Sequence, residues 1–579
     1  MKKYLIINII FFGVLFVLPA NAQAAVLYEE VNFFVDSKYD AFNRSELNAT
    51  LREIGGNIYF YVDNEYYNTL NGTYKNGLRE ELEILADEFD NVIYPKLRAV
   101  FGSEWNPGID NDDRITVLIS QLVNSAGGYI NTYDAYSKEI ISNSNEREII
   151  YLNALNIFNK NNKAFLAHEF QHLITLHQKS ILYGVEEEVW LNEARSEYAP
   201  TICGYNDIYN GSYLANRVGT FLESPSDSLT EWKNELDDYG VVSLFMHYLV
   251  DHYGNEILTK MMMNNQVGIA SINNALLDLG YPETFSDIFM NWGVANYLNN
   301  CNIGSDNKYC YLNDDLTYNH LNVDYSASYS GFPNLIVSRS SSIKDWSSYW
   351  YRFRQGGRVD TDRDNLKLEF EGLGNKSDFK VSYIVSGYRV PTEVKSFSIE
   401  NQKGTVYVPN FTSLNKSIIL IPSNQYKKSG FGSDELSSSF SFTATSVSEI
   451  PVIIEEEETI VNYPEGSLLR AKNGYKVYII KGNYKRWIQT AEIFNNYGHL
   501  NWDDIIDVDL KELNQYKDAW MIRADGDKRV YELNADATKH WLNMTAEQFT
   551  QTGHRWDMVF IVNDWERDFY TTGVDVMFN

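Results

Sequence analysis

The pattern of apolar residues changes along the chain, and each change predicts a different kind of secondary structure. Up to about residue 155, apolar residues that alternate or cluster predict short strands, while apolar residues at three- and four-residue intervals over 79–98 predict one long helix. The predicted strands are 57–62, 114–119 and 148–152. From there to about residue 300 helical periodicity dominates. The predicted helices are 165–177, 190–198, 241–253, 257–264 and 272–279.

These patterns predict an N-terminal α+β lobe over 25–155 and a helical lobe over 156–310. Beyond Cys310, short strands separated by Gly, Ser and Asn turns predict a β-sandwich over 320–448. Its predicted strands are 349–354, 366–370, 379–385, 404–408 and 417–422. Four consecutive carboxylates, Glu455 to Glu458, then predict an acidic linker over 449–465, because like charges repel and prolines flank them.

The last part of the chain repeats itself, which predicts two small α+β repeats over 466–519 and 520–579. Corresponding positions lie 53 to 55 residues apart, as in Leu469 and Ile522, Trp487 and Trp541, Thr490 and Thr545, Gly498 and Gly553, and Trp502 and Trp556. Two aromatic-rich copies indicate a binding or anchoring module with a cell-surface or polysaccharide ligand. Two copies that only pack on each other as a stable tail are the alternative. Taken together, the patterns predict a multidomain α+β fold.

The first 24 residues have the features of a secretory signal peptide. Lys2 and Lys3 precede an apolar run, and Pro19-Ala20-Asn21-Ala22-Gln23-Ala24 supplies small residues for cleavage after Ala22 or Ala24. A retained membrane anchor is the alternative, but the run of about 14 residues is short for a span of about 20. No other segment is apolar and long enough to span a membrane. We therefore expect a secreted or cell-surface protein.

Three cysteines are too few for a disulfide scaffold. In an oxidising compartment, Cys301 and Cys310 form the expected bridge and Cys203 remains a buried thiol. Three reduced thiols are the alternative. No Cys-x-x-Cys spacing occurs, which argues against cysteine metal ligands.

Composition narrows the class of protein. The 579 residues include 49 Lys and Arg and 78 Asp and Glu, so the formal charge is −29, and 44% of the residues are hydrophobic. The apolar content excludes disorder for most of the chain, and the length predicts several domains. The acidic excess argues against nucleic acid and anionic membranes as partners, since these polyanions would be repelled.

The strongest chemical signal is His168-Glu169-Phe170-Gln171-His172 within a predicted helix. Two imidazoles four residues apart project from one helix face, which suits two corners of a zinc tetrahedron, and Glu169 reaches the open corner as a base. Glu193 follows 21 residues after His172. If a helix runs from Trp190 to Tyr198 and stops ahead of Pro200, Glu193 and Glu197 share one face. One of them then completes the metal triad, and the other orients a ligand imidazole.

Here the chain resembles the gluzincin metalloproteases, in which the first motif is followed by a helix carrying Asn-Glu-x-x-Ser-Asp/Glu. The matching segment is Asn192-Glu193-Ala194-Arg195-Ser196-Glu197. The resemblance implies one catalytic Zn²⁺ held by His168, His172 and Glu193, with Glu197 and Asn192 around these ligands, and Glu169 as general base. Upstream phrases are similar to the hyicolysin type of secreted neutral protease over about residues 30 to 300: Phe89 to Pro95, Phe101-Gly102, Gly108-Ile109-Asp110 and Gly127-Gly128-Tyr129. No Gly-x-Met-Glu-Asn motif occurs, which favours an endopeptidase over an aminopeptidase.

The resemblance also implies a second donor for the oxyanion, from a Tyr or His on a later helix. Tyr239 is the first candidate, followed by His247 and then His252; each is also explained by ordinary packing. Gly127, Gly128 and Tyr129 resemble the edge strand that pairs with a peptide substrate, and a plain tight turn is the alternative.

Two acidic groups have simpler explanations than a ligand site. Asp110, Asp112 and Asp113 could hold Ca²⁺, but they lack a full calcium motif, so a turn before the next strand is favoured. Glu186 to Glu188 is expected to be a solvated run that could disfavour acidic substrates.

We therefore predict a secreted zinc endopeptidase acting on protein or peptide substrates. A cell-surface adhesin with a vestigial protease domain is the alternative. The completeness of the His168, Glu169, His172, Glu193 and Glu197 set favours the enzyme.

Overall fold

The computed structural model describes residues 25–304, 306–357, 362–388, 390–451, 462–472, 474–534, 537–552 and 554–577. The expected signal peptide over 1–24 and the carboxylates Glu455 to Glu458 lie outside the described residues. The chain is a multidomain α+β structure that divides into two compact units, one up to Ile450 and one from Pro451 onward.

The first unit begins with a six-stranded mixed sheet in the order β1-β2-β3-β4-β6-β5. The strands are β1 (Glu30–Phe34), β2 (Glu46–Ile54), β3 (Ile58–Asp63), β4 (Ile115–Ser120), β5 (Gly128–Ile130) and β6 (Ile149–Asn153). Strand β6 runs parallel to β4 and antiparallel to β5, so β5 is an edge strand of this sheet.

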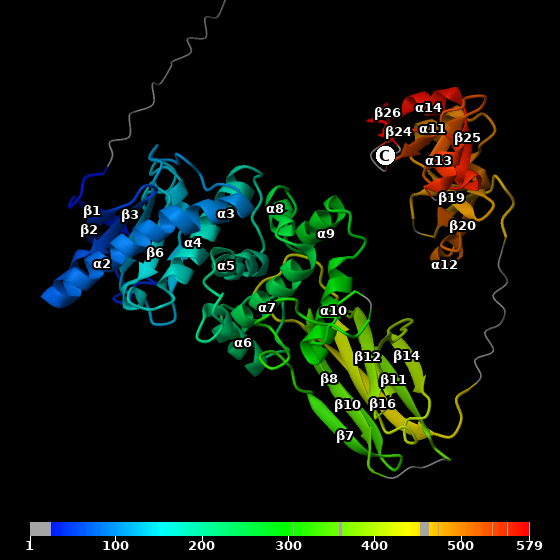
Figure 1. The fold of residues 1–579 in the computed structure, drawn as a ribbon, viewed down its shortest axis with the longest axis horizontal. Helices are drawn as coiled ribbons and strands as arrows, with labels where there is room; N and C mark the ends of the chain where they lie inside the picture. The colour runs from blue at the N-terminus through cyan, green and yellow to red at the C-terminus, as the bar shows by residue number, and fades with distance from the viewer. Residues whose placement is uncertain are drawn as a thin grey trace, which may run out of the picture. The chain divides into compact units, whose positions relative to one another are not determined.

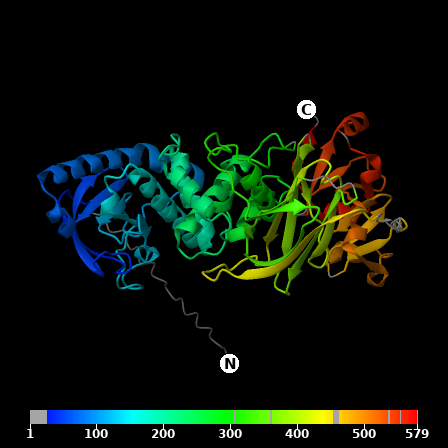
Figure 2. The same cartoon turned by 90° about the horizontal axis from the view of Figure 1, so that it is seen from below.

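Alternation along these strands supplies two buried faces. Ile58, Phe60 and Val62 of β3 join one hydrophobic cluster with helices of the first unit, while Tyr59 and Tyr61 join another with β1 and β2. Helix α2 (Gly72–Glu88) packs against the first face and covers one side of the sheet in Figure 2. A short helix α1 (Asn64–Thr69) precedes it.

The predicted helix over 79–98 is wrong at both ends and in its continuity. The structure places α2 first, then a π turn at Phe89–Ile93, then α3 (Tyr94–Phe101). Pro95 sits in the first turn of α3, where its missing N–H costs least, and the π turn before it absorbs the change in register.

The helical part carries seven further helices among the described residues. They are α4 (Asn162–Thr175), α5 (Val189–Cys203), α6 (Tyr213–Glu223), α7 (Leu236–Tyr253), α8 (Glu256–Met262), α9 (Gly268–Asp278) and α10 (Phe285–Leu298). The sequence predicted that the helix now called α5 stops ahead of Pro200, and this prediction is wrong. Instead Pro200 lies inside it, and Gly204 ends the helix in a left-handed conformation, with its N–H donating to the Thr201 carbonyl.

Two sheets follow, in the orders β13-β12-β15-β10-β7 and β14-β11-β16-β8. The strands are β7 (Ala327–Phe332), β8 (Ile336–Lys344), β9 (Ser347–Ser348), β10 (Tyr351–Gln355), β11 (Asn365–Leu373), β12 (Phe379–Gly387), β13 (Val390–Ser396), β14 (Lys403–Val408), β15 (Lys416–Asn424) and β16 (Ser437–Val447). Phe353 and Leu420 of one sheet share a cluster with Phe370 and Phe442 of the other, so the sheets pack face to face.

These two sheets pack against the helical part of the first unit, next to α10 (Figure 1). Trp346, Trp350 and Ile421 lie in the same hydrophobic cluster as the helical part, and the Trp350 indole donates to the Gly293 carbonyl of α10 at 2.9 Å. Cys301 and Cys310 form the predicted disulfide near the end of α10, and Cys203 is the predicted buried thiol.

The second unit contains two sheets with matching strand order, β20-β17-β18-β19-β21 and β25-β22-β23-β24-β26. The first repeat has β17 (Leu468–Ala471), β18 (Val477–Lys481), β19 (Tyr484–Ile488), α11 (Ala491–Asn496), β20 (Ile505–Val508), α12 (Leu510–Leu513) and β21 (Lys517–Asp518). The second has β22 (Met521–Ala524), β23 (Tyr531–Leu533), β24 (Thr538–Asn543), α13 (Ala546–Gln551), β25 (Val559–Val562), α14 (Asp564–Phe569), β26 (Thr571–Thr572) and β27 (Val576–Met577). A buried ion pair, Arg486 to Glu566, joins the two repeats at 2.6 Å.

Candidate metal centre

Helices α4 and α5 bring three ligand-type side chains to one point. His168 and His172 lie one turn apart on α4, and Glu193 faces them from α5. His168 Nε2 and His172 Nε2 are 3.2 Å apart, and Glu193 Oε2 lies 3.3 Å and 3.5 Å from them. Both imidazoles are buried at 7% exposure, so solvent does not screen the cluster.

These distances fit a zinc ion. Zinc–ligand bonds of about 2.0–2.1 Å in a tetrahedron place neighbouring ligand atoms about 3.3 Å apart. Glu193 Oε2 is buried and has no hydrogen-bond partner, which is costly for a carboxylate unless a cation satisfies it. Two nitrogens and one oxygen are the donor set of zinc hydrolases that keep a fourth position open.

The electrostatics of the site favour a cation between these residues. Burial lowers the pKa of His172, but the charge of Glu193 outweighs this effect and raises it to about 9. Partial burial raises the pKa of Glu193, but the two imidazoles outweigh this effect and hold it below its usual range. The carboxylate is therefore ionised and available as a ligand at neutral pH.

Glu169 lies between the two histidines and faces the edge of the sheet. Burial raises the pKa of its carboxyl group, with the imidazoles opposing that effect. A Cβ at Gly128 of β5 would come within 2.9 Å of Glu169 Cγ and Oε1, so only glycine lets this strand pass so close. A Cβ at Gly127 would come within 3.0 Å of the Phe165 ring. The structure thus brings Gly127 and Gly128 against helix α4, which carries His168 and His172.

Tyr129 points elsewhere. Its ring is stacked between Tyr39, 4.6 Å away, and Tyr151, 4.2 Å away, in the second cluster of the sheet. Its hydroxyl accepts a hydrogen bond from the Asp36 N–H. The side chain is therefore part of the packing that fixes β5, and the glycine before it is what faces Glu169.

Glu197 lies behind His168 and is held by a network that sequence reasoning missed. Its Oε1 is 3.4 Å from His168 Nδ1. Arg217 of α6 donates to both carboxylate oxygens, and the Tyr213 hydroxyl donates to Oε1 at 2.6 Å. These contacts fix the carboxylate beside the His168 ring. No local pattern indicates Arg217, because its contact depends on how α6 packs.

His172 is oriented from the other side by residues of α5. Ser196 Oγ lies 3.1 Å from His172 Nδ1 and donates to the Gln171 side chain at 2.5 Å. Asn192 stands one residue before Glu193 on α5, and its Oδ1 is buried without a hydrogen-bond partner among the described residues. The serine was quoted in the motif but had no role assigned to it.

Of the residues proposed as donors to the oxyanion, Tyr239 lies near the candidate metal centre. Tyr239 lies near the carboxylates of Glu169, Glu193 and Glu197, which add to burial in raising its pKa. Its hydroxyl donates to Asn234 Oδ1 at 2.9 Å, and the Arg217 guanidinium lies 4.8 Å from its ring centroid. It remains protonated at neutral pH and can donate a hydrogen bond.

His247 and His252 are not placed as donors. His247 is fully buried, with Nδ1 2.8 Å from the Ser243 carbonyl and Nε2 2.9 Å from Thr201 Oγ1. Burial lowers its pKa to about 4, and both ring nitrogens contact core residues, so these contacts give no support to its role as an alternative donor. His252 Nε2 lies 3.0 Å from the Cys310 carbonyl.

The calcium candidates do not form a ligand cluster. Asp110 accepts the Asp112 N–H, and Asp112 accepts the Tyr59 hydroxyl and the Arg114 N–H. These are turn and strand contacts. Among the described residues, a second group of close carboxylates is Asp227, Asp238 and Glu435. Lys344 pairs with Asp227 and Glu435, Lys233 pairs with Glu435, and Asp238 accepts the N–H groups of Lys233 and Glu235.

The run at Glu186 to Glu188 is not fully solvated, contrary to expectation. Glu187 is only 1% exposed at its side chain and pairs with Arg195, while Glu188 accepts the Trp190 indole N–H and the Gly430 N–H. These glutamates fasten the start of α5 to its surroundings.

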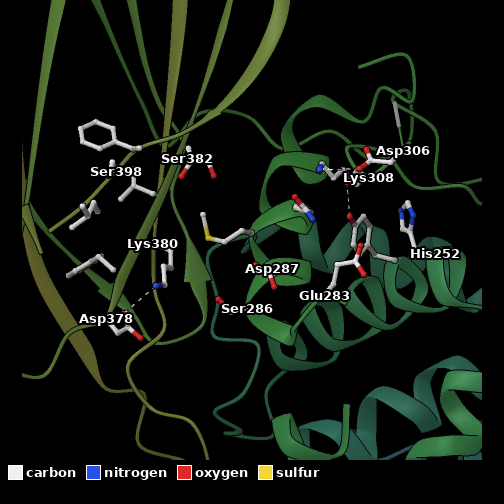
Figure 3. A pocket seen from close by; sticks show the side chains of 18 of the residues that line it. His252, Glu283, Ser286, Asp287, Asp306, Lys308, Asp378, Lys380, Ser382 and Ser398 are labelled. Carbon is white, nitrogen blue, oxygen red and sulfur yellow. Dashed lines mark hydrogen bonds and ion pairs between the residues drawn. The ribbon is translucent and has the colours of Figure 1, made fainter. Parts of the chain in front are cut away.

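A large cavity of about 700 Å³ lies elsewhere, between α7, α10 and β12 (Figure 3). Glu283, Asp287, Lys308 and Lys380 are among its lining residues, and none of the metal-site residues lines it. It is separate from the His168 site.

Comparison with known proteins points to a metalloprotease. The chain is 25% identical over 238 residues to the neutral metalloprotease ShpI of Staphylococcus hyicus. The match covers 36% of this chain and 52% of that protein, so the chain spans about half the length of this relative. No family model matches the chain.

The similar solved structures give no argument about the fold of this chain. The pre-peptidase C-terminal domain of a Bacillus anthracis collagenase matches 21% of this chain and 99% of its own length, at 9% identity and a TM-score of 0.15. The Yersinia pseudotuberculosis-derived mitogen matches 22% of this chain and 97% of its own, at 13% identity and a TM-score of 0.15. Scores this low do not establish a shared fold. Among the described helices, none has the length and apolar character needed to cross a bilayer.

Proposed function

We propose that the protein is an exported zinc endopeptidase of the gluzincin group, similar to the hyicolysin type. The observation that carries the proposal is the spacing of 3.2–3.5 Å among His168 Nε2, His172 Nε2 and Glu193 Oε2, beside the buried carboxylate of Glu169. The partial similarity to a neutral metalloprotease supports the same activity. The signal-like sequence over 1–24 supports export.

In this proposal zinc, when bound, supplies a water of lowered pKa and a positive charge for the carbonyl oxygen of the substrate. Glu169 would accept a proton from the attacking water and later donate one to the leaving amine. Burial raises the pKa of the Glu169 carboxyl group, which makes it a stronger base than an exposed glutamate. Glu197 and Ser196 hold the two imidazoles in place.

Tyr239 is the proposed second donor to the developing oxyanion. Its hydroxyl carries a proton at neutral pH and lies in the field of the site carboxylates. The substrate backbone pairs with the free edge of β5, where Gly128 permits close approach to Glu169.

Hydrolysis of a peptide library by the full chain tests this function. Activity should be lost with a zinc chelator and return with added zinc. Activity that persists in chelator would reject a metal-dependent mechanism. Inactivity in zinc-loaded protein would favour the alternative, a surface-binding protein with a vestigial site.

The tail is proposed to be a binding module for a cell-surface polysaccharide. Trp502 is 46% exposed and stacks on Phe494 at 4.1 Å, and Trp556 is 48% exposed and packs in a tilted arrangement on Phe549 at 4.4 Å. Rigid exposed indoles at matching positions are suited to stacking on sugar rings. The double variant Trp502→Ala, Trp556→Ala should lose retention on envelope polysaccharide, while Trp565→Ala, which changes another exposed indole, should keep it. Equal retention by the wild type and the double variant would reject this role.

A further inference from the structure

The large cavity beside β12 has one wall whose own contacts hold it in place. This wall, called the helical wall below, consists of the end of α7, the start of α10 and the loop closed by the Cys301–Cys310 disulfide. The Tyr248 hydroxyl donates to the Lys308 carbonyl at 2.6 Å, and His252 Nε2 lies 3.0 Å from the Cys310 carbonyl. These contacts tie the loop to α7, so the wall is preorganised for a ligand.

Three carboxylates lie on the helical wall, and they differ in how they are satisfied. Asp306 has an ion-pair partner among the described residues, Lys308 at 3.0 Å. Asp287 Oδ2 accepts the N–H and the hydroxyl of Thr284, which closes the first turn of α10. Glu283 Oε2 is buried and has no hydrogen-bond partner among the described residues. A carboxylate oxygen in that position is costly unless a ligand satisfies it.

The opposite wall belongs to β12 and the segment after β13. Lys380 Nζ lies 3.9 Å from Asp378 Oδ1, and Lys428 pairs with the same side chain at 3.1 Å. Figure 3 shows Lys380 and Asp378 on the side of the sheet, across from Glu283 and Asp287. Hydroxyl and amide side chains complete this wall: Ser382, Ser396, Ser398 and Gln402.

The charges of the two walls do not cancel. Four carboxylates and two lysines line the cavity, and Lys428 brings a third cation next to Asp378. His252 adds no positive charge at neutral pH, because burial lowers its pKa. Since the lysines lie beside Asp306 and Asp378, the negative excess remains at Glu283 and Asp287.

Tyr253 lies where this negative charge gathers. Burial raises the pKa of its hydroxyl, and the carboxylates of Glu283, Asp287 and Asp306 add to the rise. The Tyr281 ring packs edge-on against the Tyr253 ring at 4.8 Å and holds it in place. The face of an aromatic ring attracts cations, and carboxylates accept charge-assisted hydrogen bonds from ammonium and guanidinium groups.

A metal ion fits this lining less well than an organic cation. Among the described residues, three ligand atoms converge within 4.8 Å at the His168 site and at the Asp227 group, neither of which is in the cavity. A lysine or arginine side chain carries several N–H donors and can reach acceptors that lie apart. The volume of about 700 Å³ is in the range of ligand pockets, and the hydroxyl and amide groups opposite suit a peptide backbone.

We propose that this cavity binds basic side chains of a polypeptide, with Glu283 and Asp287 receiving the ammonium or guanidinium group. In the function proposed above that polypeptide is the substrate, and this part of the inference rests on that function. Helix α7 connects the two sites, since Tyr239 near its start lies by the metal-site carboxylates and Tyr253 at its end lines the cavity. The two tyrosines are about 21 Å apart along the helix. A basic residue held in the cavity therefore lies about six or more residues from the bond that is cut.

Fluorescence anisotropy with two labelled peptides tests the site. One peptide alternates glycine and arginine, and the other has citrulline, which is similar in shape but neutral, in place of arginine. The protein is the full chain carrying Glu169→Gln, so that the probe is not cut. The arginine peptide should bind about 10-fold more tightly or better, and this preference should shrink at high salt. Equal binding of the two peptides, or no binding of the arginine peptide, would overturn the inference.

Three further substitutions in the same background make the test specific. Glu283→Gln should remove most of the preference for arginine. Lys308→Met should strengthen binding of the arginine peptide, because it removes a competing cation from Asp306. Glu256→Gln is the control, since this exposed carboxylate follows α7 but does not line the cavity. An undiminished preference in Glu283→Gln, or weaker binding in Lys308→Met, would contradict the proposed site.

Hydrolysis by the chain with Glu169 intact separates the cavity from the proposed function. Glu283→Gln should raise KM about 10-fold more for an arginine-bearing substrate than for its citrulline counterpart. An equal change for both substrates would overturn the role in substrate binding. If no substrate is cut while the arginine preference in binding persists, the peptidase function fails and the cavity stands as a site for basic peptides.

Discussion

Arg217 donates two hydrogen bonds to the carboxylate of Glu197, from Nε to Oε2 at 2.7 Å and from Nη2 to Oε1 at 2.8 Å. Glu197 Oε1 in turn lies 3.4 Å from Nδ1 of the proposed ligand His168. Replacing Arg217 by Met should weaken zinc binding by about 10–100-fold, since partners of ligand imidazoles typically contribute that much. Competition with a chromogenic chelator measures the affinity.

Two further variants calibrate that experiment. Arg217→Lys keeps the charge but loses the two-pronged geometry, so its zinc affinity should lie between those of the wild type and the Met variant. Arg79→Met, on the exposed face of α2, should leave the affinity unchanged. Wild-type affinity in Arg217→Met would show that Glu197 is held without this ion pair.

Glu169→Gln should lower kcat for peptide hydrolysis by about 10³-fold or more, because the amide cannot accept the proton of the attacking water. The amide is nearly the same size, so zinc content should stay near that of the wild type. Elemental analysis of the purified variant measures this content. Loss of zinc together with activity would mean that Glu169 supports the site structurally and does not act as the base.

Gly128→Ala should reduce kcat/KM by about 10²-fold through misplacement of the base or the substrate strand. The new Cβ would lie 2.8 Å from the Tyr151 carbonyl oxygen and 2.9 Å from Glu169 Cγ, so either β5 or Glu169 must move. Gly77→Ala on α2 is the control, since its Cβ meets only the Phe158 ring at 3.7 Å. That variant should be fully active. Full activity in Gly128→Ala would contradict the proposed contact between strand and base.

Glu148→Gln should raise the Tm at pH 9 by about 5 °C and change it little at pH 5. Burial, with repulsion from Asp110, raises the pKa of Glu148 to about 8 from an ordinary value of 4.5. The folded state therefore holds a proton that the unfolded chain releases, and stability falls as pH rises between these two values. The amide removes this penalty.

Glu146→Gln provides the comparison for Glu148. Glu146 lies two residues away, on the surface, and pairs with Lys138 at 3.4 Å. Its replacement should not raise the Tm at pH 9. Parallel pH profiles for the wild type and Glu148→Gln would show that the Glu148 carboxyl titrates normally.

The sequence predicted the parts of the site that lie on one helix or at a characteristic spacing. His168, Glu169 and His172 are one turn of α4, and the periodicity that places them together is local. Arg217 and Tyr213 approach the site from α6 through tertiary packing, which a single sequence does not encode in any short pattern. The same limit explains why His247 was a candidate donor. The sequence predicted its helix, but not which side of that helix faces the metal centre.

Local rules also misplaced two helix boundaries. A proline inside a helix costs a hydrogen bond, so an end before Pro200 was the reasonable expectation. In the structure α5 continues to Cys203, because Tyr198, Ala199 and Cys203 are buried in the main hydrophobic cluster and packing offsets the cost. The π turn at Phe89–Ile93 has no signature in the apolar pattern.

The helices and the β-strands that follow them share one hydrophobic core. This limits where the chain can be shortened. Trp346, Trp350 and Ile421 from the strands complete the cluster around α10, and Phe431 approaches Trp190 of α5. A gene shortened after the codon for Cys310 would leave that cluster open to water. The strands up to Ile450 would therefore have to be inherited together with the helices they cover.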